Sequence, residues 1–358
     1  MMRRALDLAR EGVGLVSPNP LVGCVIVAEE GRVVGEGSYT YDGVTHAEAA
    51  ALEQAGHRAR GGTAYVSLEP HAHHGRTPPC TDLLLAAGIK RVVAPIEDPN
   101  PLVSGKGFAE LRDHGIEVDV GVLAEEAARL NEKFTVWHRE GRPFVHLKLA
   151  ISLDGRISLN RSTSTAISSH AAGGRVHEIR HEHDAILVGG NTAVVDDPSL
   201  TDRSGNARRR KLVRVVLDNR LAILPGSKLA QTARNVPTVV ISSSSDDAKR
   251  SELESLGVEV IRDDARDLSA VLQHLRQKDL QSVLVEGGSE VAGAFLDACL
   301  VDKFTFIYAP IVIGGHEAPV AIGGKGPATI SEAIHIRDIQ VVYLGDDVEA
   351  TGYPEFAK

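Results

Sequence analysis

Residues 45–80 decide the fold of the first part of the chain, and they read THAEAAALEQAGHRARGGTAYVSLEPHAHHGRTPPC. The alanine-rich segment from Thr45 to about Ala55 is predicted to be a helix, and the apolar run Thr63–Leu68 a strand. A second helix is expected from Thr81 to Ala87, closed by Gly88. Helices that alternate with strands are typical of an α/β layer fold with a largely parallel sheet.

The same alternation extends on both sides of this stretch. Leu6, Ala9 and Val13 share one face of a predicted N-terminal helix. Two apolar runs, 21–28 and 32–38, flank Glu29-Glu30-Gly31 and predict a β-hairpin. Further strands are expected at 91–95 and 116–120, with helices at 107–114 and 123–139.

Glu140-Gly141-Arg142-Pro143 is the best domain boundary, because a long predicted helix ends there and Gly and Pro interrupt the pattern. The expected domains are therefore residues 1–141 and 142–358. In the second, strands are predicted at 144–151, 185–188, 213–217, 238–241, 258–261, 283–285 and 304–308. Helices are expected near 170–181, 247–256, 268–277 and 289–300.

Composition and charge exclude several classes of protein. The net charge of −9 argues against a nucleic-acid binder, which usually carries a basic surface. Three cysteines do not form a disulfide framework, and Cys24 and Cys299 are expected to be buried structural residues. The N-terminus lacks the apolar core of a signal peptide, and no run is long enough to span a membrane. We expect a cytoplasmic protein without nucleic-acid or membrane partners.

His46-Ala47-Glu48, followed by the segment from Pro70 to Cys80, indicates a zinc-dependent hydrolytic deaminase. Zinc in a catalytic site takes three protein ligands and leaves a fourth position open for water. In such a site Glu48 would act as the proton-transferring catalytic residue and would not bind the metal. The alternative is that Thr45-His46-Ala47-Glu48 is only a helix capping box.

The metal ligands predicted from this pattern are His46, His71 and Cys80. Deaminases of this kind normally carry Cys at the position of His71, so the predicted site has one thiolate and a formal charge of +1 with zinc. A more positive site should make bound water more acidic. His73 or His74 could replace His71 as the ligand, or the site could be free of metal.

Glu286-Gly287-Gly288-Ser289 follows the apolar strand 283–285 and opens a predicted helix. Glycines allow close approach of a phosphate, and a helix N-terminus offers free N–H groups to an anion. The segment lacks the G-x-G-x-x-G pattern, so it does not indicate a Rossmann fold. A plain tight turn is the alternative. The basic run Arg208-Arg209-Arg210-Lys211 is expected to be a solvated loop rather than an anion site.

Motifs along the whole chain resemble the bifunctional deaminase/reductases of riboflavin biosynthesis. They are Pro18-Asn19-Pro20-Leu21-Val22-Gly23, His46-Ala47-Glu48, Leu68-Glu69-Pro70, Gly75-Arg76-Thr77-Pro78-Pro79-Cys80, Leu147-Lys148-Leu149-Ala150, Ser152-Leu153-Asp154-Gly155, Ala185-Ile186-Leu187-Val188-Gly189, Asp196-Asp197-Pro198-Ser199-Leu200-Thr201 and Val285-Glu286-Gly287-Gly288. The resemblance implies a cytidine-deaminase-like three-layer domain, followed by a dihydrofolate-reductase-like α/β domain.

The resemblance also implies two consecutive reactions. The first is zinc-dependent deamination of 2,5-diamino-6-(5-phosphoribosylamino)pyrimidin-4-one, and the second is NADPH-dependent reduction of the ribosyl chain to ribityl. The implied partner is a phosphorylated pyrimidine, and the implied assembly is a homo-oligomer. The residues implied to bind the cofactor are Ala150, Ala166, Thr192, Asp196, Gly288, Ser289, Glu290, Val291, Ala292, Gly293 and Ala294. Those implied to bind substrate are Asn19, Ser164, Arg180, Leu200, Arg203 and Glu286.

Two departures from the family pattern keep alternatives open. Ser164-Thr165-Ala166-Ile167 lacks the tryptophan that the family often carries there, which removes stacking area near the cofactor. His71 leaves room for a reductase whose deaminase half has decayed. A transfer-RNA deaminase shares the H-x-E pattern, but the acidic charge and the second domain argue against it.

Overall fold

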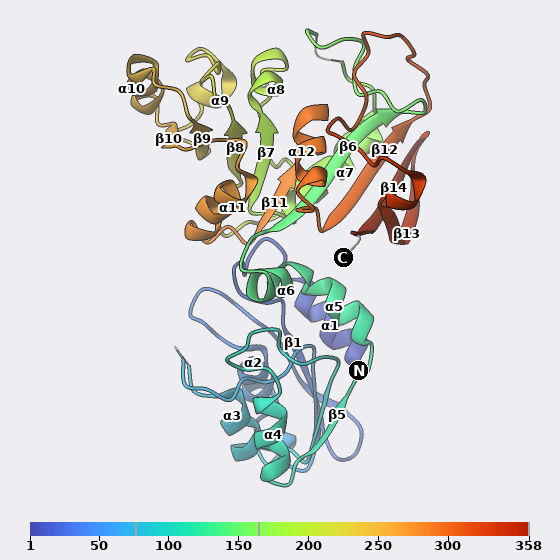
Figure 1. The fold of residues 1–358 in the computed structure, drawn as a ribbon. Coiled ribbons are helices and arrows are strands. Elements are labelled where there is room, and N and C mark those ends of the chain that lie inside the picture. Colours follow the sequence, from blue (N-terminus) through green and yellow to red (C-terminus); the bar gives the residue numbers. More distant parts are fainter. Residues whose placement is uncertain (76, 164, 357–358) are drawn as a thin grey trace. The chain divides into compact units, whose positions relative to one another are not determined.

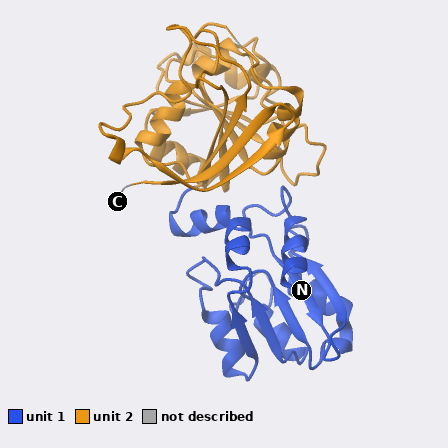
Figure 2. Ribbon diagram, turned by 90° about the vertical axis from the view of Figure 1, so that its right-hand side faces the viewer, with its two compact units in different colours: residues 1–142 blue, residues 143–358 orange. Residues whose placement is uncertain are grey.

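The computed structural model describes residues 1–75, 77–163 and 165–356. The chain divides into two compact units, Met1–Arg142 and Pro143–Lys358 (Figures 1 and 2). The division falls within the segment Glu140–Pro143. Each unit is built around its own β-sheet.

The first unit contains a five-stranded sheet of order β2-β1-β3-β4-β5. Its strands are β1 (Gly23–Val27), β2 (Val33–Ser38), β3 (Thr63–Val66), β4 (Arg91–Ala94) and β5 (Glu117–Val120). Strand β1 is antiparallel to β2 and β3, and β3, β4 and β5 are parallel. The predicted hairpin around Glu29-Glu30-Gly31 is confirmed.

Helices cover both faces of this sheet and make three layers (Figure 1). They are α1 (Met2–Arg10), α2 (Ala47–Ala55), the short 3-10 helix η1 (Gly56–Ala59), α3 (Cys80–Ala86), α4 (Lys106–Asp113), α5 (Ala124–Leu130) and α6 (Glu132–Arg139). Cys24 and Ile26 of β1 pack with α2, α3 and α4, whereas Val25 and Val27 pack with α1 and α5. The alternation along β1 gives each face its own apolar core.

Two predicted helix boundaries are wrong for physical reasons. Residues 123–139 form two helices instead of one, because the buried Asn131 leaves the helical path and pairs with the main chain of Leu21. Its Nδ2 donates to the Leu21 carbonyl (2.9 Å) and its Oδ1 accepts from the Leu21 amide (2.8 Å). Helix α2 begins at Ala47, not Thr45, and His46 is its N-cap residue without a side-chain capping bond.

The second unit contains a nine-stranded sheet of order β10-β9-β8-β7-β11-β6-β12-β14-β13. Its strands are β6 (Phe144–Ser152), β7 (Ala185–Gly189), β8 (Val213–Leu217), β9 (Thr238–Ser242), β10 (Glu259–Arg262), β11 (Ser282–Val285), β12 (Lys303–Ala309), β13 (His335–Leu344) and β14 (Asp347–Glu355). The strands from β10 to β12 in this order are parallel, and β14 and β13 join antiparallel. The sequence analysis did not predict β13 and β14.

The helices of this unit again cover both faces. They are α7 (His170–His181), α8 (Gly190–Val195), α9 (Lys228–Gln231), α10 (Asp247–Ser255), α11 (Leu268–Gln277), α12 (Ser289–Asp297) and the 3-10 helix η2 (Ile330–Glu332). Leu187 and Val215 pack on the side of α11 and α12, and Ile186 and Val216 pack on the side of α8, α9 and α10. Crossovers through helices on both faces are what a parallel sheet requires.

Cys24 is buried as expected, but Cys299 is exposed just beyond the end of α12, so that prediction is wrong. Among the residues that the structure describes, no helix has the length and apolar character needed to cross a membrane.

Candidate metal centre and cofactor pocket

His46, His71 and Cys80 converge in the first unit, as the sequence predicts. Their potential ligand atoms all lie within 4.8 Å of one another. The imidazole rings of His46 and His71 are stacked, with centroids 4.5 Å apart and planes inclined by 27°. His46 caps α2, Cys80 is the first residue of α3, and His71 lies on the irregular segment between β3 and α3.

Close packing of α2 on β2 fixes the position of His46. A Cβ atom at Gly35 would lie 2.0 Å from the Ala51 carbonyl oxygen, and one at Gly37 would lie 2.4 Å from the Ala47 carbonyl oxygen. Only glycine allows this contact between a helix backbone and a strand. The start of α2 is therefore held directly against the sheet.

Glu48 is the second residue of α2 and is buried, with 3% of its surface exposed. Burial raises the pKa of its carboxyl group, and the Cys80 thiol is hydrogen-bonded to it. Its Oε2 atom has no hydrogen-bond partner among the residues that the structure describes. Since Thr45 lies outside the helix and His46 is the N-cap, the capping-box explanation for Glu48 is wrong.

His71 is already in the protonation state that binds a metal, whereas Cys80 must lose a proton to do so. Burial, with contributions from His46 and His73, lowers the pKa of His71 to about 4, so its imidazole is neutral at pH 7. Burial raises the pKa of the Cys80 thiol well above its usual range, and metal binding releases the proton of such a thiol. A tetrahedral zinc ion separates its N and S ligands by about 3.5 Å. In the structure the potential ligand atoms lie within 4.8 Å of one another, so metal binding would draw them closer together.

Asn19 and His73 flank the three ligands. Asn19 donates from Nδ2 to the hydroxyl of Tyr39 (2.8 Å), and the Tyr39 ring packs edge-on against His46 at 5.5 Å. Tyr39 therefore connects Asn19 to His46. The His73 ring contacts His71 at 5.3 Å but is exposed, as is His74.

Glu69, which immediately precedes Pro70-His71, has a structural role that was not predicted from sequence. Its buried carboxylate accepts four main-chain hydrogen bonds, from Asp98 (3.0 Å), Gly105 (2.9 Å), Gly107 (2.9 Å) and Phe108 (3.3 Å). A Cβ atom at Gly107 would lie 1.9 Å from the Pro70 carbonyl oxygen. Segment 98–108 is thus tied to the strand end that leads to His71.

The second unit contains a cavity of 1180 Å³ at the carboxyl ends of its central strands. The predicted cofactor residues that line it are Ala150, Ala166, Thr192, Asp196, Gly288, Ser289, Glu290, Val291 and Ala294. Gly288 precedes α12, whose N-terminal amides offer donors to an anion. The cavity also reaches Asn219 and Arg220, which follow β8 and which the sequence analysis did not consider.

Two predicted cofactor residues lie elsewhere. Ala292 is fully buried in the apolar core, and a Cβ atom at Gly293 would lie 2.3 Å from the main chain of Gly323. The helical period of α12 turns these two positions away from the cavity. Their prediction as contact residues is not supported by the structure.

Only some of the residues predicted to bind substrate in the second unit line the cavity. Arg180 and Glu286 line the cavity. Leu200 is buried in the core with a left-handed backbone (φ 48°), and Arg203 is exposed on the segment that follows. Ser164 falls outside the described residues.

Lys148, Arg180 and Glu286 form a buried charged group on the cavity wall. Nε and Nη2 of Arg180 donate to the two carboxylate oxygens of Glu286, each at 2.9 Å. Lys148 Nζ lies 3.9 Å from Glu286 Oε2. Burial alone would raise the pKa of Glu286, but Lys148 and Arg180 outweigh it and hold that pKa below its usual range. The Nε and Nη2 donors of Arg180 are thus both occupied by Glu286.

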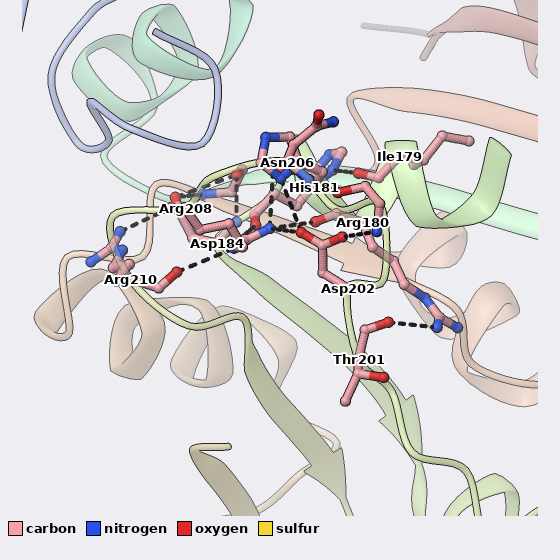
Figure 3. A network of polar contacts seen from close by, with 12 residues as sticks. Ile179, Arg180, His181, Asp184, Thr201, Asp202, Asn206, Arg208 and Arg210 are labelled. Atoms are coloured by element: carbon pink, nitrogen blue, oxygen red, sulfur yellow. Dashed lines mark hydrogen bonds and ion pairs between the residues drawn. The ribbon is translucent and has the colours of Figure 1, made fainter. Parts of the chain in front are cut away.

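Arg208 and Arg210 are not solvated, contrary to expectation. Arg208 is largely buried and donates to main-chain carbonyls at the end of α7, and Arg210 pairs with Asp184 at 3.1 Å (Figure 3).

Comparison with known proteins assigns each unit to a family. The profile of the cytidine and deoxycytidylate deaminase zinc-binding region matches residues 1–95, and that of the RibD C-terminal domain matches residues 143–349. The chain is 40% identical to riboflavin biosynthesis protein RibD of Bacillus amyloliquefaciens over 100% of this chain and 96% of that protein. It is 41% identical to RibD of Aquifex aeolicus over 97% and 96%.

Two solved structures match this chain over nearly its full length. Form 1 of Acinetobacter baumannii RibD superposes with a TM-score of 0.87 at 36% identity, covering 99% of this chain and 98% of that one. The diaminohydroxyphosphoribosylaminopyrimidine deaminase/5-amino-6-(5-phosphoribosylamino)uracil reductase of Thermotoga maritima has a TM-score of 0.86 at 37% identity, with coverages of 99% and 97%. Both the order of the two units and the fold of each are shared. The chain therefore belongs to the RibD family of bifunctional deaminase/reductases.

Proposed function

We propose that this chain carries out two successive steps of riboflavin biosynthesis. Residues 1–141 would deaminate 2,5-diamino-6-(5-phosphoribosylamino)pyrimidin-4-one, and residues 142–358 would reduce the product with NADPH. The observation that carries the proposal is the convergence of His46, His71 and Cys80 beside the buried Glu48, in a chain similar over its full length to RibD proteins.

In the first unit, His46, His71 and Cys80 would hold one zinc ion. Bound zinc acts as a Lewis acid and lowers the pKa of a water molecule that it binds. Glu48 would carry the proton: its Oε2 has no hydrogen-bond partner within the described part of the chain, and burial favours the protonated carboxyl. Asn19 would contact the pyrimidine, since its Tyr39 partner places it next to His46.

The assignment of His71 as a ligand is tested by metal analysis. Purified His71→Ala is expected to lose most of its zinc, whereas His71→Cys keeps it, because a thiolate is also a zinc ligand. His73→Ala and His74→Ala are the matched controls, and both should retain zinc. Full zinc content in His71→Ala would exclude His71 as a ligand.

In the second unit, NADPH would occupy the cavity of 1180 Å³ and supply a hydride. The amides at the start of α12, from Ser289 onward, would bind its pyrophosphate. Lys148, held near Glu286, would donate a hydrogen bond to an oxygen of the ribosyl chain that is reduced. Arg180 would orient Glu286 through Nε and Nη2 rather than use these two donors to bind a phosphate.

Separate measurement of each reaction tests the function as a whole. Zinc-loaded protein is given the diaminopyrimidine substrate with and without NADPH, and ammonia release and NADPH oxidation are followed independently. We expect ammonia under both conditions and NADPH oxidation after deamination. Absence of ammonia contradicts the deaminase assignment, and absence of NADPH oxidation with deaminated substrate contradicts the reductase assignment.

We further propose that the enzyme is a cytoplasmic homo-oligomer that acts on small phosphorylated pyrimidines. Its few cysteines fit a reducing compartment. Light scattering during gel filtration measures the assembly directly, and a monomer at micromolar concentration would contradict it.

A further inference from the structure

Strand β14 brings a second buried carboxylate, that of Glu349, to the face of the sheet on which Lys148 lies. Lys148 of β6 is paired in register with Thr305 of β12, and Thr305 is paired with Thr351 of β14. Paired residues of neighbouring strands share a face, and so do residues two apart along one strand, so Glu349 lies on the face of Lys148. Both side chains are buried, with 7% of Lys148 and 4% of Glu349 exposed.

Helix α7 packs on this face against β12 and supplies one arginine to each of two carboxylates. Arg175 donates from Nε to Glu349 Oε2 (2.9 Å) and from Nη2 to Oε1 (3.4 Å). Arg180 donates to both oxygens of Glu286, which follows β11. Since β6 lies between β11 and β12 in the sheet, Lys148 has an arginine–carboxylate pair on either side of it.

Hydrogen bonds between side chains tie Glu349 to β6 across the intervening strand. Thr351 Oγ1 donates to Glu349 Oε1 (3.3 Å). The Thr305 hydroxyl lies 2.7 Å from Thr351 Oγ1 and 2.8 Å from His146 Nε2. His146 precedes Lys148 by two residues on the same face of β6. The Glu349 carboxylate is therefore held in place relative to the strand that carries Lys148.

The charged groups around Lys148 act on it in opposite directions. Burial lowers the pKa of its ammonium group, and Arg180 adds to this effect, whereas Glu286 and Glu349 raise that pKa. Glu286 Oε2 lies 3.9 Å from Lys148 Nζ, and His177 of α7 lies near Glu286. Lys148 and Arg180 carry two positive charges against the one negative charge of Glu286. A second carboxylate is therefore needed to balance them away from water.

Arg175 does not cancel the charge of Glu349 completely, because it is shared with two more exposed carboxylates on and just after α7. Its Nη1 lies 3.1 Å from Glu178 Oε2 and 3.7 Å from Glu182 Oε1. The side chains of Glu178 and Glu182 are 60% and 36% exposed, against 5% for Glu349, so water screens their charges far more. Glu349 thus adds negative charge to the surroundings of Lys148.

We propose that Glu349, held by Arg175, is a positioning residue of the reductase step, which together with Glu286 keeps the ammonium group of Lys148 charged and fixed at the cavity wall. The inference rests on the proposed function, in which Lys148 donates a hydrogen bond to the ribosyl chain. Among the described residues, those that line the cavity include Lys148 but not Glu349. Glu349 therefore acts through Lys148.

The first measurement is the pKa of Lys148 itself, followed by ¹³C NMR of its Cε atom in cofactor-free protein labelled at lysine. Lys148→Met assigns the resonance, because it is missing from the spectrum of that variant. Glu349→Gln removes a negative charge and keeps the shape, so the Lys148 pKa should fall by about one unit. Arg175→Met removes a positive charge from the same group, so the pKa should instead rise.

The matched control is Glu178→Gln, because Glu178 pairs with the same arginine but is exposed. Its Lys148 pKa should stay within about 0.2 unit of wild type. Glu349→Asp keeps the charge on a shorter side chain and should restore most of the wild-type value.

The second measurement is the pH dependence of kcat/KM for NADPH oxidation with 5-amino-6-(5-phosphoribosylamino)uracil, which reports the pKa values of the free enzyme. The alkaline limb should move in each variant in the same direction as the Lys148 pKa. A purely structural role for Glu349 would lower activity at every pH and leave the limb where it is.

The outcomes separate the two claims. A wild type that neither binds NADPH nor reduces the deaminated substrate contradicts the proposed function, whatever the Lys148 pKa. In functional enzyme, an unchanged Lys148 pKa in Glu349→Gln, or an equal shift in Glu178→Gln, overturns the inference about Glu349. An alkaline limb that does not follow the Lys148 pKa also overturns it. If Glu349→Gln does not fold, Arg175→Met decides, and a Lys148 pKa that fails to rise in that variant overturns the inference.

Discussion

Replacing Glu69 with glutamine should unfold the first unit far more easily while leaving the second intact. The carboxylate of Glu69 is 4% exposed and accepts four main-chain hydrogen bonds, two on each oxygen. A glutamine keeps one oxygen and turns an NH₂ group toward two N–H donors. Two charge-assisted bonds are lost, at about 1.5–3 kcal/mol each, so the free energy of unfolding should fall by about 3–6 kcal/mol.

Urea unfolding can measure this loss selectively. The one tryptophan of the sequence, Trp137, lies in α6 of the first unit, so its fluorescence reports on that unit. With a slope of ~2 kcal/mol per molar urea, the midpoint should fall by about 2 M. NADPH binding to the second unit should persist.

The matched control is Glu30→Gln, because Glu30 is exposed and bonds to the neighbouring Arg32 on the surface. Its midpoint should stay within about 0.3 M of wild type. A shift of that small size for Glu69→Gln, or an equal shift in both variants, would refute the argument that the Glu69 carboxylate holds segment 98–108.

Three further perturbations follow from the structure. Gly107→Ala places a Cβ atom 1.9 Å from the Pro70 carbonyl oxygen, so the backbone leading to His71 must move. The zinc content of the purified variant should therefore fall. Full retention of zinc would show that the contact is easily relieved. Asp98 has a pKa raised to about 6, mainly by burial, from 3.8; the folded state holds a proton that the unfolded chain releases, so stability declines as pH rises from about 4 to 6. Asp98→Asn should therefore raise the free energy of unfolding, measured with urea, by up to ~3 kcal/mol at pH 7 and leave it unchanged at pH 4; equal effects at both pH values would contradict this. Arg214 is 1% exposed and donates hydrogen bonds to Ser199, Leu229, Thr232, Val236 and Thr238. Arg214→Met leaves three main-chain carbonyls without this donor, which at about 1–3 kcal/mol each should lower the free energy of unfolding by about 3 kcal/mol or more; an unchanged Tm would oppose it.

The elements that could be predicted from sequence are those whose apolar period is set by burial. Helices α7, α10, α11 and α12 and the buried strands of both sheets lie close to their predicted positions. Strand β13 was missed because most of its residues are exposed, and β14 because Gly352, Pro354 and several acidic residues hide its pattern. Strand β14 is ordered by pairing with β12, which is distant in sequence, and β13 by pairing with β14.

The convergence of His46, His71 and Cys80 was predictable because His46 and Cys80 lie at helix starts and all three share a short stretch of sequence. The break at Asn131 was not, since it depends on hydrogen bonds to Leu21, which is 110 residues away. The contacts of Arg208 with the end of α7 were hidden for the same reason. In the folded chain, Arg208 of the basic run donates hydrogen bonds to carbonyls at the end of α7.

The close contact of α2 with Gly35 and Gly37 has a consequence for how the metal centre can vary. No side chain separates helix from strand there, so His46 cannot shift without moving the sheet. Cys80 is likewise fixed at the first residue of α3. His71 alone of the three lies on irregular backbone, outside any helix or strand. Two of the three candidate donors are therefore held by regular secondary structure, and we expect exchange between a sulfur and a nitrogen donor to be tolerated best at the third, position 71.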